Sequence, residues 1–524
     1  MNAFKTTILA GFAALAMAGT ALAQDVTIGR ATEPSSIDPH FSRSANNQMT
    51  SSDIFDRLVM SDPQLQISPG LALSWTNLDP LTWEIKLREG VKFHDGSDFT
   101  AEDVVYSLER VKDIPNSPAP YTDMVASVEA YEVVDPLTLR VKTRTPAPAL
   151  IEEIGRVFIV SRAAAEGKSI DDFNSGAAAI GTGPYKFERW TPGEQLVLAR
   201  NEDYWGERPD FENVTLRFIA NDAARVAAFL SGSVDLIDAV PPADLDRLQN
   251  TSGVNVESID SGRLIYLGIN QRPGAVPFFV DLSGQPLDPS PARDPRVRKA
   301  LSKLIDRQLI IDRLINGSGT AAGQLVPEGI GGHVADLPAD EADVEGAKAL
   351  LAEAGYAEGF GITVHSSNDR FAGDGDIAQA LGQMFARGGL TVNGVVTQPY
   401  NVYAANASKG EFGAFVFSLG TSTPDAAPNL SALLETYSQE AGTGSFNRMR
   451  YSNPEFDAAL ATALEDFDTQ GRIDGLEAAT RIAFEDMAIV PLFWQRVHWA
   501  AREGFGYTPN MSEYTTAAWT LSAN

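Results

Sequence analysis

The chain has 524 residues, enough for two or three domains, and 44% of them are hydrophobic, so sizeable buried cores are possible. Its formal charge of -28 at pH 7 disfavours nucleic acid and anionic lipid as partners, and it suits a protein kept monomeric by repulsion. The absence of cysteine excludes disulfides and thiol chemistry.

The N-terminus has the pattern of an export signal. Lys5 supplies a positive charge, and residues 8–21 form an apolar stretch too short to span a bilayer stably. Ala21-Leu22-Ala23 then gives the small-residue cleavage pattern, so we expect residues 1–23 to be removed. No cysteine follows for lipid attachment, which predicts a free periplasmic protein. The alternatives are a buried N-terminal helix or a membrane anchor.

The first region reads as a small β-sheet with a helix. Residues 82–87 alternate like a strand, and two further strand-like runs follow at 128–134 and 137–143. Between them, Thr100 and Asp103 predict a reciprocal cap at the start of a helix.

The middle of the chain alternates strands and helices. Residues 214–218 predict a strand, Asn221 caps a helix that Gly232 ends, and residues 234–240 form the next strand, so the two strands should be parallel. Asp294 begins another helix, whose apolar face is Val297, Ala300, Leu301, Leu304 and Ile305.

The stretch 362–418 shows the clearest α/β alternation. It contains predicted strands at 362–366, 390–398 and 413–418, with one helix before Gly388 and another over 400–408. Alternation of this kind builds an open, mostly parallel sheet, whose ligands bind beyond the carboxyl ends of the strands. Those ends nominate three pocket loops, at 366–368, 398–400 and 418–420.

No enzyme motif is present. The chain lacks HExxH, GxSxG and Walker A patterns, and its five histidines do not pair at i, i+4: they are His40, His94, His333, His365 and His498. We therefore expect no catalysis, no metal site and no cofactor. His40 and His498 could still meet in space, which keeps a nickel ligand open as an alternative.

The block at 71–110, LALSWTNLDPLTWEIKLREGVKFHDGSDFTAEDVVYSLER, resembles the signature of the family 5 extracellular solute-binding proteins. These are the dipeptide-, oligopeptide- and nickel-binding receptors of bacterial ABC importers. Six further motifs stand in the family's order, one before this block and five after it, and the resemblance runs from about Ala31 to about Leu492. They are SSIDPH at 35–40, GTGPYKFERWTPGEQLVLARNEDYWG at 181–206, AARVAAFLSGSVDLID at 223–238, DPRVRKALSKLIDRQLI at 294–310, AKALLAEAGY at 347–356 and YSNPEFDAAL at 451–460.

The resemblance implies an α/β, two-lobe periplasmic binding protein of type II, cluster C-like, with an inserted extra domain and a two-strand hinge. Lobe I would comprise 24–56, 181–268 and 491–524, the extra domain 57–180, and lobe II 269–490. YLGINQR at 266–272 and PLFWQRVHWA at 491–500 look like the crossing strands. SSIDPH looks like the motif that places the first pocket loop.

The resemblance and the strand ends together give a set of candidate ligand-binding residues. Dipeptide binders of the family hold the ligand's amino group with an Asp in a GW-x-x-D-like loop, where this chain reads LGTSTPDAAPNL, with Thr421 at the Trp position and Asp425 as a displaced Asp. Arg370 is the predicted anion anchor, and a surface Arg paired with Asp369 or Asp374 is the alternative. The full set is Ser44, Asn46, Asn270, Asn368, Arg370, Tyr400, Ser418, Gly420, Thr421, Asp425, Trp494 and Gln495.

The sequence therefore predicts a monomeric periplasmic receptor that captures a peptide or peptide-like solute between two closing lobes and delivers it to an ABC permease. Within that class, opines, glutathione-like compounds, sugars and nickel remain possible ligands. A secreted hydrolase and a chaperone-like binder of unfolded segments are the alternatives from other classes.

Overall fold

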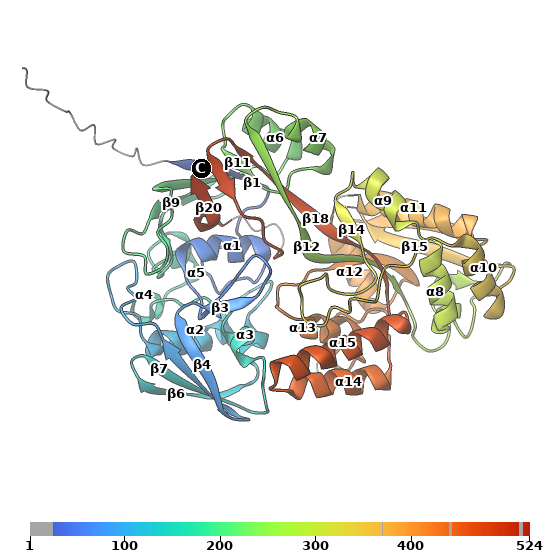
Figure 1. The fold of residues 1–524 in the computed structure, drawn as a ribbon, viewed down its shortest axis with the longest axis horizontal. Helices are drawn as coiled ribbons and strands as arrows, with labels where there is room; N and C mark the ends of the chain where they lie inside the picture. The colour runs from blue at the N-terminus through green and yellow to red at the C-terminus, as the bar shows by residue number, and fades with distance from the viewer. Residues whose placement is uncertain (1–24, 369, 372, 440–442, 513–516, 524) are drawn as a thin grey trace, which may run out of the picture.

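The computed structural model describes residues 25–368, 370–371, 373–439, 443–512 and 517–523. The predicted export signal lies outside this part of the chain. Twelve of the described strands form one continuous sheet, and two long antiparallel strands run through its centre: β12 (Val254–Ile269) and β18 (Val490–Arg502). Figure 1 shows them crossing between two halves of the molecule that lie side by side.

One half of the sheet holds the first and middle parts of the chain. Its central strand β1 (Val26–Arg30) pairs in parallel with both β10 (Asn213–Phe218) and β11 (Leu236–Ile237). The predicted β-α-β unit is thus confirmed, with α6 (Asp222–Leu230) between its strands and Asn221 accepting a hydrogen bond from the Ala224 N–H. The antiparallel strands β9 (Gln195–Arg200) and β8 (Tyr185–Thr191) complete this side.

A separate four-stranded antiparallel sheet lies below this half (Figure 1), in the order β4 (Ala72–Asp79), β5 (Thr82–Leu87), β7 (Thr138–Thr143) and β6 (Val128–Asp135). Helix α2 (Ala101–Arg110) begins with the predicted capping box of Thr100 and Asp103. Strands and helix enclose a core of their own, which includes Ile85, Val104 and Val141. The elements predicted for this region are confirmed.

The other half holds the predicted α/β alternation. Strand β15 (Gly361–Ser367) pairs in parallel with both β16 (Thr391–Gln398) and β17 (Ala414–Leu419), and β17 pairs antiparallel with β12. Helices α11 (Asp374–Arg387) and α12 (Tyr400–Lys409) connect these strands, as predicted.

Helix α8 (Pro295–Lys303) begins at Asp294, whose carboxylate accepts a hydrogen bond from the Arg296 N–H. It ends two residues earlier than its apolar pattern, because Leu304 and Ile305 leave the helix and still pack into the same core.

The remaining elements connect and cover these sheets. The helices are α1 (Ala45–Ile54), α3 (Leu150–Ile154), α4 (Arg162–Ala165), α5 (Ile170–Asn174), α7 (Leu245–Gln249), α9 (Arg307–Leu314), α10 (Val344–Glu353), α13 (Ala427–Leu434), α14 (Pro454–Glu465) and α15 (Thr469–Glu485). The strands are β2 (Val59–Ser61), β3 (Ile67–Pro69), β13 (Phe279–Val280), β14 (Gly319–Ala321), β19 (Phe505–Tyr507) and β20 (Leu521–Ala523). Across the described ranges, no helix is both long enough and apolar enough to cross a bilayer.

Candidate ligand cavity between the two halves

A cavity of about 520 Å³ lies where the two halves face each other. One half contributes residues of the segment from Arg43 to Leu65, the pair Arg156 and Phe158, and residues of the C-terminal stretches 508–512 and 517–520. The other half contributes the loop after β17, at Gly420, Thr421 and Ser422. A ligand bound in this cavity would touch both halves at once.

The loop at 420–422 is held against the crossing strands. The Thr421 N–H donates to the carbonyl oxygen of Gly262 at 2.9 Å, and the Asn429 amide donates to Thr421 Oγ1 at 2.6 Å. Gly262 lies in the irregular stretch of β12 between Asp260 and Leu264. A Cβ at Gly262 would lie 2.6 Å from the Thr421 carbonyl oxygen, so only glycine allows the loop to approach this closely.

Three arginines line the wall opposite this loop. Arg57 lies in an isolated antiparallel bridge with Phe158, and its guanidinium carbon is 4.0 Å from the centre of the Phe158 ring. The same guanidinium donates to Gln48 Oε1 at 2.9 Å. Arg43 forms an ion pair with Asp123 at 2.9 Å, and Arg156 donates to Ser422 Oγ at 2.8 Å. Arg156 therefore reaches across to the loop of the other half.

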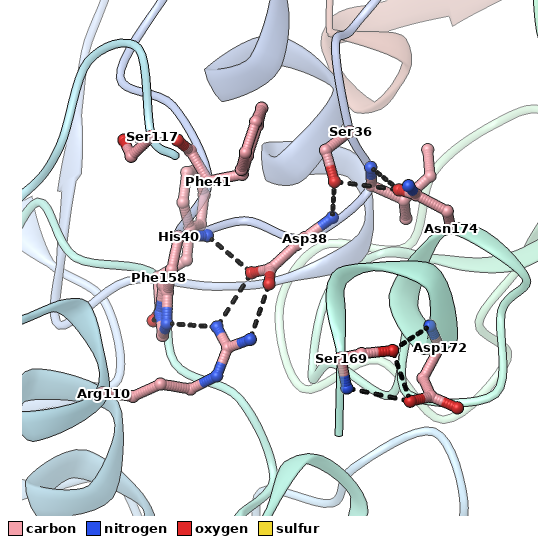
Figure 2. Close-up of polar contacts among 11 residues, drawn as sticks. Ser36, Asp38, His40, Phe41, Arg110, Ser117, Phe158, Ser169, Asp172 and Asn174 are labelled. Carbon is pink, nitrogen blue, oxygen red and sulfur yellow. Dashed lines mark hydrogen bonds and ion pairs between the residues drawn. The ribbon is translucent and has the colours of Figure 1, made fainter. Parts of the chain in front are cut away.

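The SSIDPH motif contacts Phe158 of this wall, and Figure 2 shows Asp38 and His40 of the motif beside Arg110 and Phe158. The buried Asp38 carboxylate holds both terminal nitrogens of Arg110 and accepts a hydrogen bond from the His40 N–H. Because a guanidinium can only donate, His40 Nδ1 accepts from Arg110, and its Nε2–H donates to the Phe158 carbonyl at 2.7 Å. Burial and the adjacent Arg110 lower the pKa of His40 to about 4, which agrees with a neutral ring. The motif thus positions Phe158, on which Arg57 stacks.

The structure brings Gly420 and Thr421 into the cavity wall, and the other predicted site residues lie outside it. Ser44 and Asn46 flank the start of α1, next to lining residues, and bond to Asn47 and to the Glu33 carbonyl. Most of the others also have partners within the protein. Asn270 donates to the Phe412 carbonyl, Ser418 accepts from Arg263, Trp494 donates to the Leu325 carbonyl, and Gln495 lines a second, smaller cavity of about 170 Å³.

The two charged candidates have different surroundings. Asp425 is buried and forms an ion pair with Arg472 at 2.8 Å, and it also accepts from the Ala427 N–H. Arg370 is exposed, as is Asn368, and its guanidinium carbon lies 5.0 Å from the centre of the Tyr400 ring. The Asp374 carboxylate accepts a hydrogen bond from the Arg370 backbone N–H, and Asp369, the other predicted partner of Arg370, lies outside the described residues.

The described residues contain no cluster of three or more His, Asp and Glu side chains that could hold a metal ion. His40 bonds to Arg110 and Phe158, and His498 bonds to Ser258 and Ser318. Each of these two histidines is thus engaged with protein groups in its own surroundings.

Sequence reasoning missed Arg43, Arg57 and Arg156. Arg43 comes from a loop, Arg57 from a short bridge, and Arg156 from the turn after the short helix α3. No local pattern marks any of them. Only the fold brings them to one wall.

A two-part α/β molecule with a cavity between its halves, joined by two crossing strands, has the architecture of a solute-binding protein. Residues 66–440 match the bacterial extracellular solute-binding proteins, family 5, middle region, and the chain belongs to that family. This confirms the resemblance seen in the sequence and the predicted class of function.

Individual relatives and solved structures match this chain over nearly its whole length. The glutathione-binding protein GsiB of Escherichia coli strain K12 is 27% identical over 498 residues, covering 93% of this chain and 92% of that protein. HbpA2 from Haemophilus parasuis matches with a TM-score of 0.80 at 25% identity, covering 96% of this chain and 100% of that one. The periplasmic binding protein DppA from Helicobacter pylori, solved with the peptide STSA, matches with a TM-score of 0.75 at 22% identity, covering 95% and 98%. The two-lobe fold is confirmed.

Proposed function

We propose that this protein captures a peptide or peptide-like solute in the cavity between its halves and delivers it to the permease of an ABC importer. The observation that carries the proposal is the cavity itself, which is formed by both halves and has a volume typical of small-molecule sites. A ligand there binds the closed arrangement more tightly than an open one, and this differential affinity drives closure.

The division of the chain into lobes is part of the proposal. Lobe I comprises 24–56, 181–268 and 491–524, the extra domain 57–180, and lobe II 269–490. The pairing of β12 supports a change of lobe within this strand, a few residues before the 268/269 boundary, because Val254–Asp260 pairs with β18 alone, whereas Leu264–Ile269 also pairs with β17. The irregularity between Asp260 and Leu264 is where we place the hinge.

We also propose that the chain is exported, cleaved after Ala23, monomeric and without catalytic activity. The charge of -28, the N-terminal pattern and the family support these statements. Gly420 and Thr421 are the predicted site residues that we assign to ligand contact, since they line the cavity.

Native mass spectrometry of the protein purified from the periplasm of an exporting bacterium tests this function. We expect one small molecule bound per chain. After denaturation and refolding remove it, the same molecule should raise the melting temperature by mass action. Glutathione and a short peptide are the first probes, because of the relatives. Turnover of the bound molecule into a product would favour the hydrolase, and binding of unfolded protein segments would favour the chaperone-like alternative.

A further inference from the structure

The wall formed by Arg43, Arg57 and Arg156 carries three positive charges, and the described carboxylates around it balance them only in part. Arg43 has an ion pair with Asp123, but within the described part of the chain Arg57 and Arg156 bond only to the neutral side chains of Gln48 and Ser422. The Nε atoms of Arg43 and Arg57 are buried and have no hydrogen-bond partner among the described residues. Arginines without a carboxylate partner stand out in this chain, because its 69 acidic residues outnumber its 41 basic residues.

The arginines lie close enough to repel one another. Burial, together with the nearby Arg156, lowers the pKa of Arg57 to about 10. Burial also lowers the pKa of Arg156, with Arg43 as the next cause. Crowded cations cost free energy in an empty site, and an anion between them would relieve that cost.

The carboxylates that line the cavity face other donors. Asp56 accepts from Thr182, Tyr204 and Trp205, and Asp62 accepts from the backbone N–H groups of Gln64 and Gln66. Three more carboxyls lie near Arg156: Asp123, which pairs with Arg43, and Glu152 and Glu153. Burial raises the pKa of both Glu152 and Glu153 to about 7, so each carries only part of its charge near neutral pH.

We propose that the cavity selects an acidic solute, one that carries a carboxylate which Arg57 and Arg156 bind from the wall opposite Thr421. A guanidinium matches a carboxylate with two parallel hydrogen bonds, and two such groups at one wall favour an acid over its neutral amide. Arg156 already bonds to Ser422, so an acid held by it is also held against the loop of the other half. The inference rests on the proposed receptor function and adds the chemical class of its solute.

Matched acid and amide probes test this inference on the stripped, refolded full chain. The probes are glutathione and its glycine monoethyl ester, the tripeptides Ala-Glu-Ala and Ala-Gln-Ala with free and amidated C-termini, and inorganic phosphate. Calorimetry should show the acid forms binding at least tenfold more tightly than their amide or ester partners. Equal binding of acid and neutral forms would overturn the inference and leave the receptor function standing. Binding of phosphate alone would also overturn it, since the anchored group would then not be a carboxylate.

Substitutions assign the preference to the wall. Arg57→Gln and Arg156→Gln should each weaken the acid probe about 30-fold or more and leave its neutral partner nearly unchanged, so that the acid preference collapses. The affinity of Arg57→Lys for the acid probe should lie between those of the parent chain and Arg57→Gln, because an ammonium keeps the charge but cannot form the two parallel hydrogen bonds. Arg208→Gln is the control, an exposed arginine paired with Glu202 and absent from the cavity wall. Suppose that both Gln variants melt like the parent chain and still prefer the acid probe. The anion would then bind elsewhere, and the inference would be contradicted. If no probe binds in either form and nothing co-purifies, the receptor function itself fails, and the inference falls with it.

Discussion

At the scale of single residues, the ion pair between Asp38 and Arg110 holds the SSIDPH loop to helix α2, which packs on the four-stranded sheet. Asp38 is fully buried and Arg110 has 11% of its side chain exposed. Replacing Asp38 with Asn would leave the Arg110 charge buried and unpaired, so we expect Asp38→Asn to lower the free energy of unfolding by about 3 kcal/mol.

Urea unfolding monitored by circular dichroism measures this loss. Asp98→Asn is the matched control, since Asp98 and its partner Lys92 are 73% and 46% exposed, and such pairs contribute less than about 1 kcal/mol. If the two variants lose similar amounts, Asp38 does not have the role we assign to it.

His40 makes the same loop sensitive to acid. Its pKa is about 4 in the folded protein, below the ordinary value of 6.5, so between these values the unfolded chain binds the proton and the folded one does not. The stability that neutral His40 contributes is therefore fully present above pH 6.5 and is lost as the pH falls toward 4.

We expect the difference in unfolding free energy between the wild-type protein and His40→Asn to shrink steadily over that window. Urea titrations at several pH values measure it. A constant difference from pH 7 to pH 4.5 would mean that His40 titrates normally in the folded state.

At the scale of elements, Gly262 in β12 allows the cavity loop to lie against the hinge. A Cβ there would lie 2.6 Å from the Thr421 carbonyl oxygen, which belongs to the backbone and cannot turn away. Gly262→Ala should therefore displace the 420–422 loop, weaken ligand binding and cost about 1–3 kcal/mol of stability. Gly394→Ala in β16 is the control, because its nearest neighbour would be 3.8 Å away. Calorimetry and urea unfolding of both variants decide the point, and parent-like binding by Gly262→Ala would show that the loop is not placed by this contact.

Most elements could be predicted from the sequence because their signals are local. The capping box at Thr100 and Asp103 and the alternation at 362–418 depend on residues close together in the chain. The GTGPY motif is also explained, since a Cβ at Gly181 would lie 2.0 Å from the Ile54 carbonyl oxygen, although no sequence pattern names that partner.

Sequence reasoning could predict those residues of the site that lie directly after the carboxyl end of a strand. Gly420 and Thr421 lie just beyond β17, as the rule for open sheets requires. The partner of Asp425 is 47 residues away at Arg472, and Arg57 meets Phe158 across a bridge of distant segments. Contacts of this kind depend on the tertiary fold, so no local period or spacing reveals them.

At the scale of the whole molecule, the account depends on two halves that close around a solute. If the ligand supplies the contacts that hold the halves together, few direct bonds between them are needed. The hydrogen bond from Arg156 to Ser422 is one side-chain bond that joins the two halves. The other half also affects Glu152, because burial and the charge of Asp425 together raise the pKa of Glu152 to about 7.

The measurement that tests closure most directly is small-angle X-ray scattering of the stripped protein with and without the solute that co-purifies with it. We predict that saturation with this solute reduces the radius of gyration, since hinge closure about β12 and β18 compacts the molecule. A melting temperature that rises while the radius of gyration stays constant would contradict the account, because it would place the ligand in a preformed site that needs no movement of the halves.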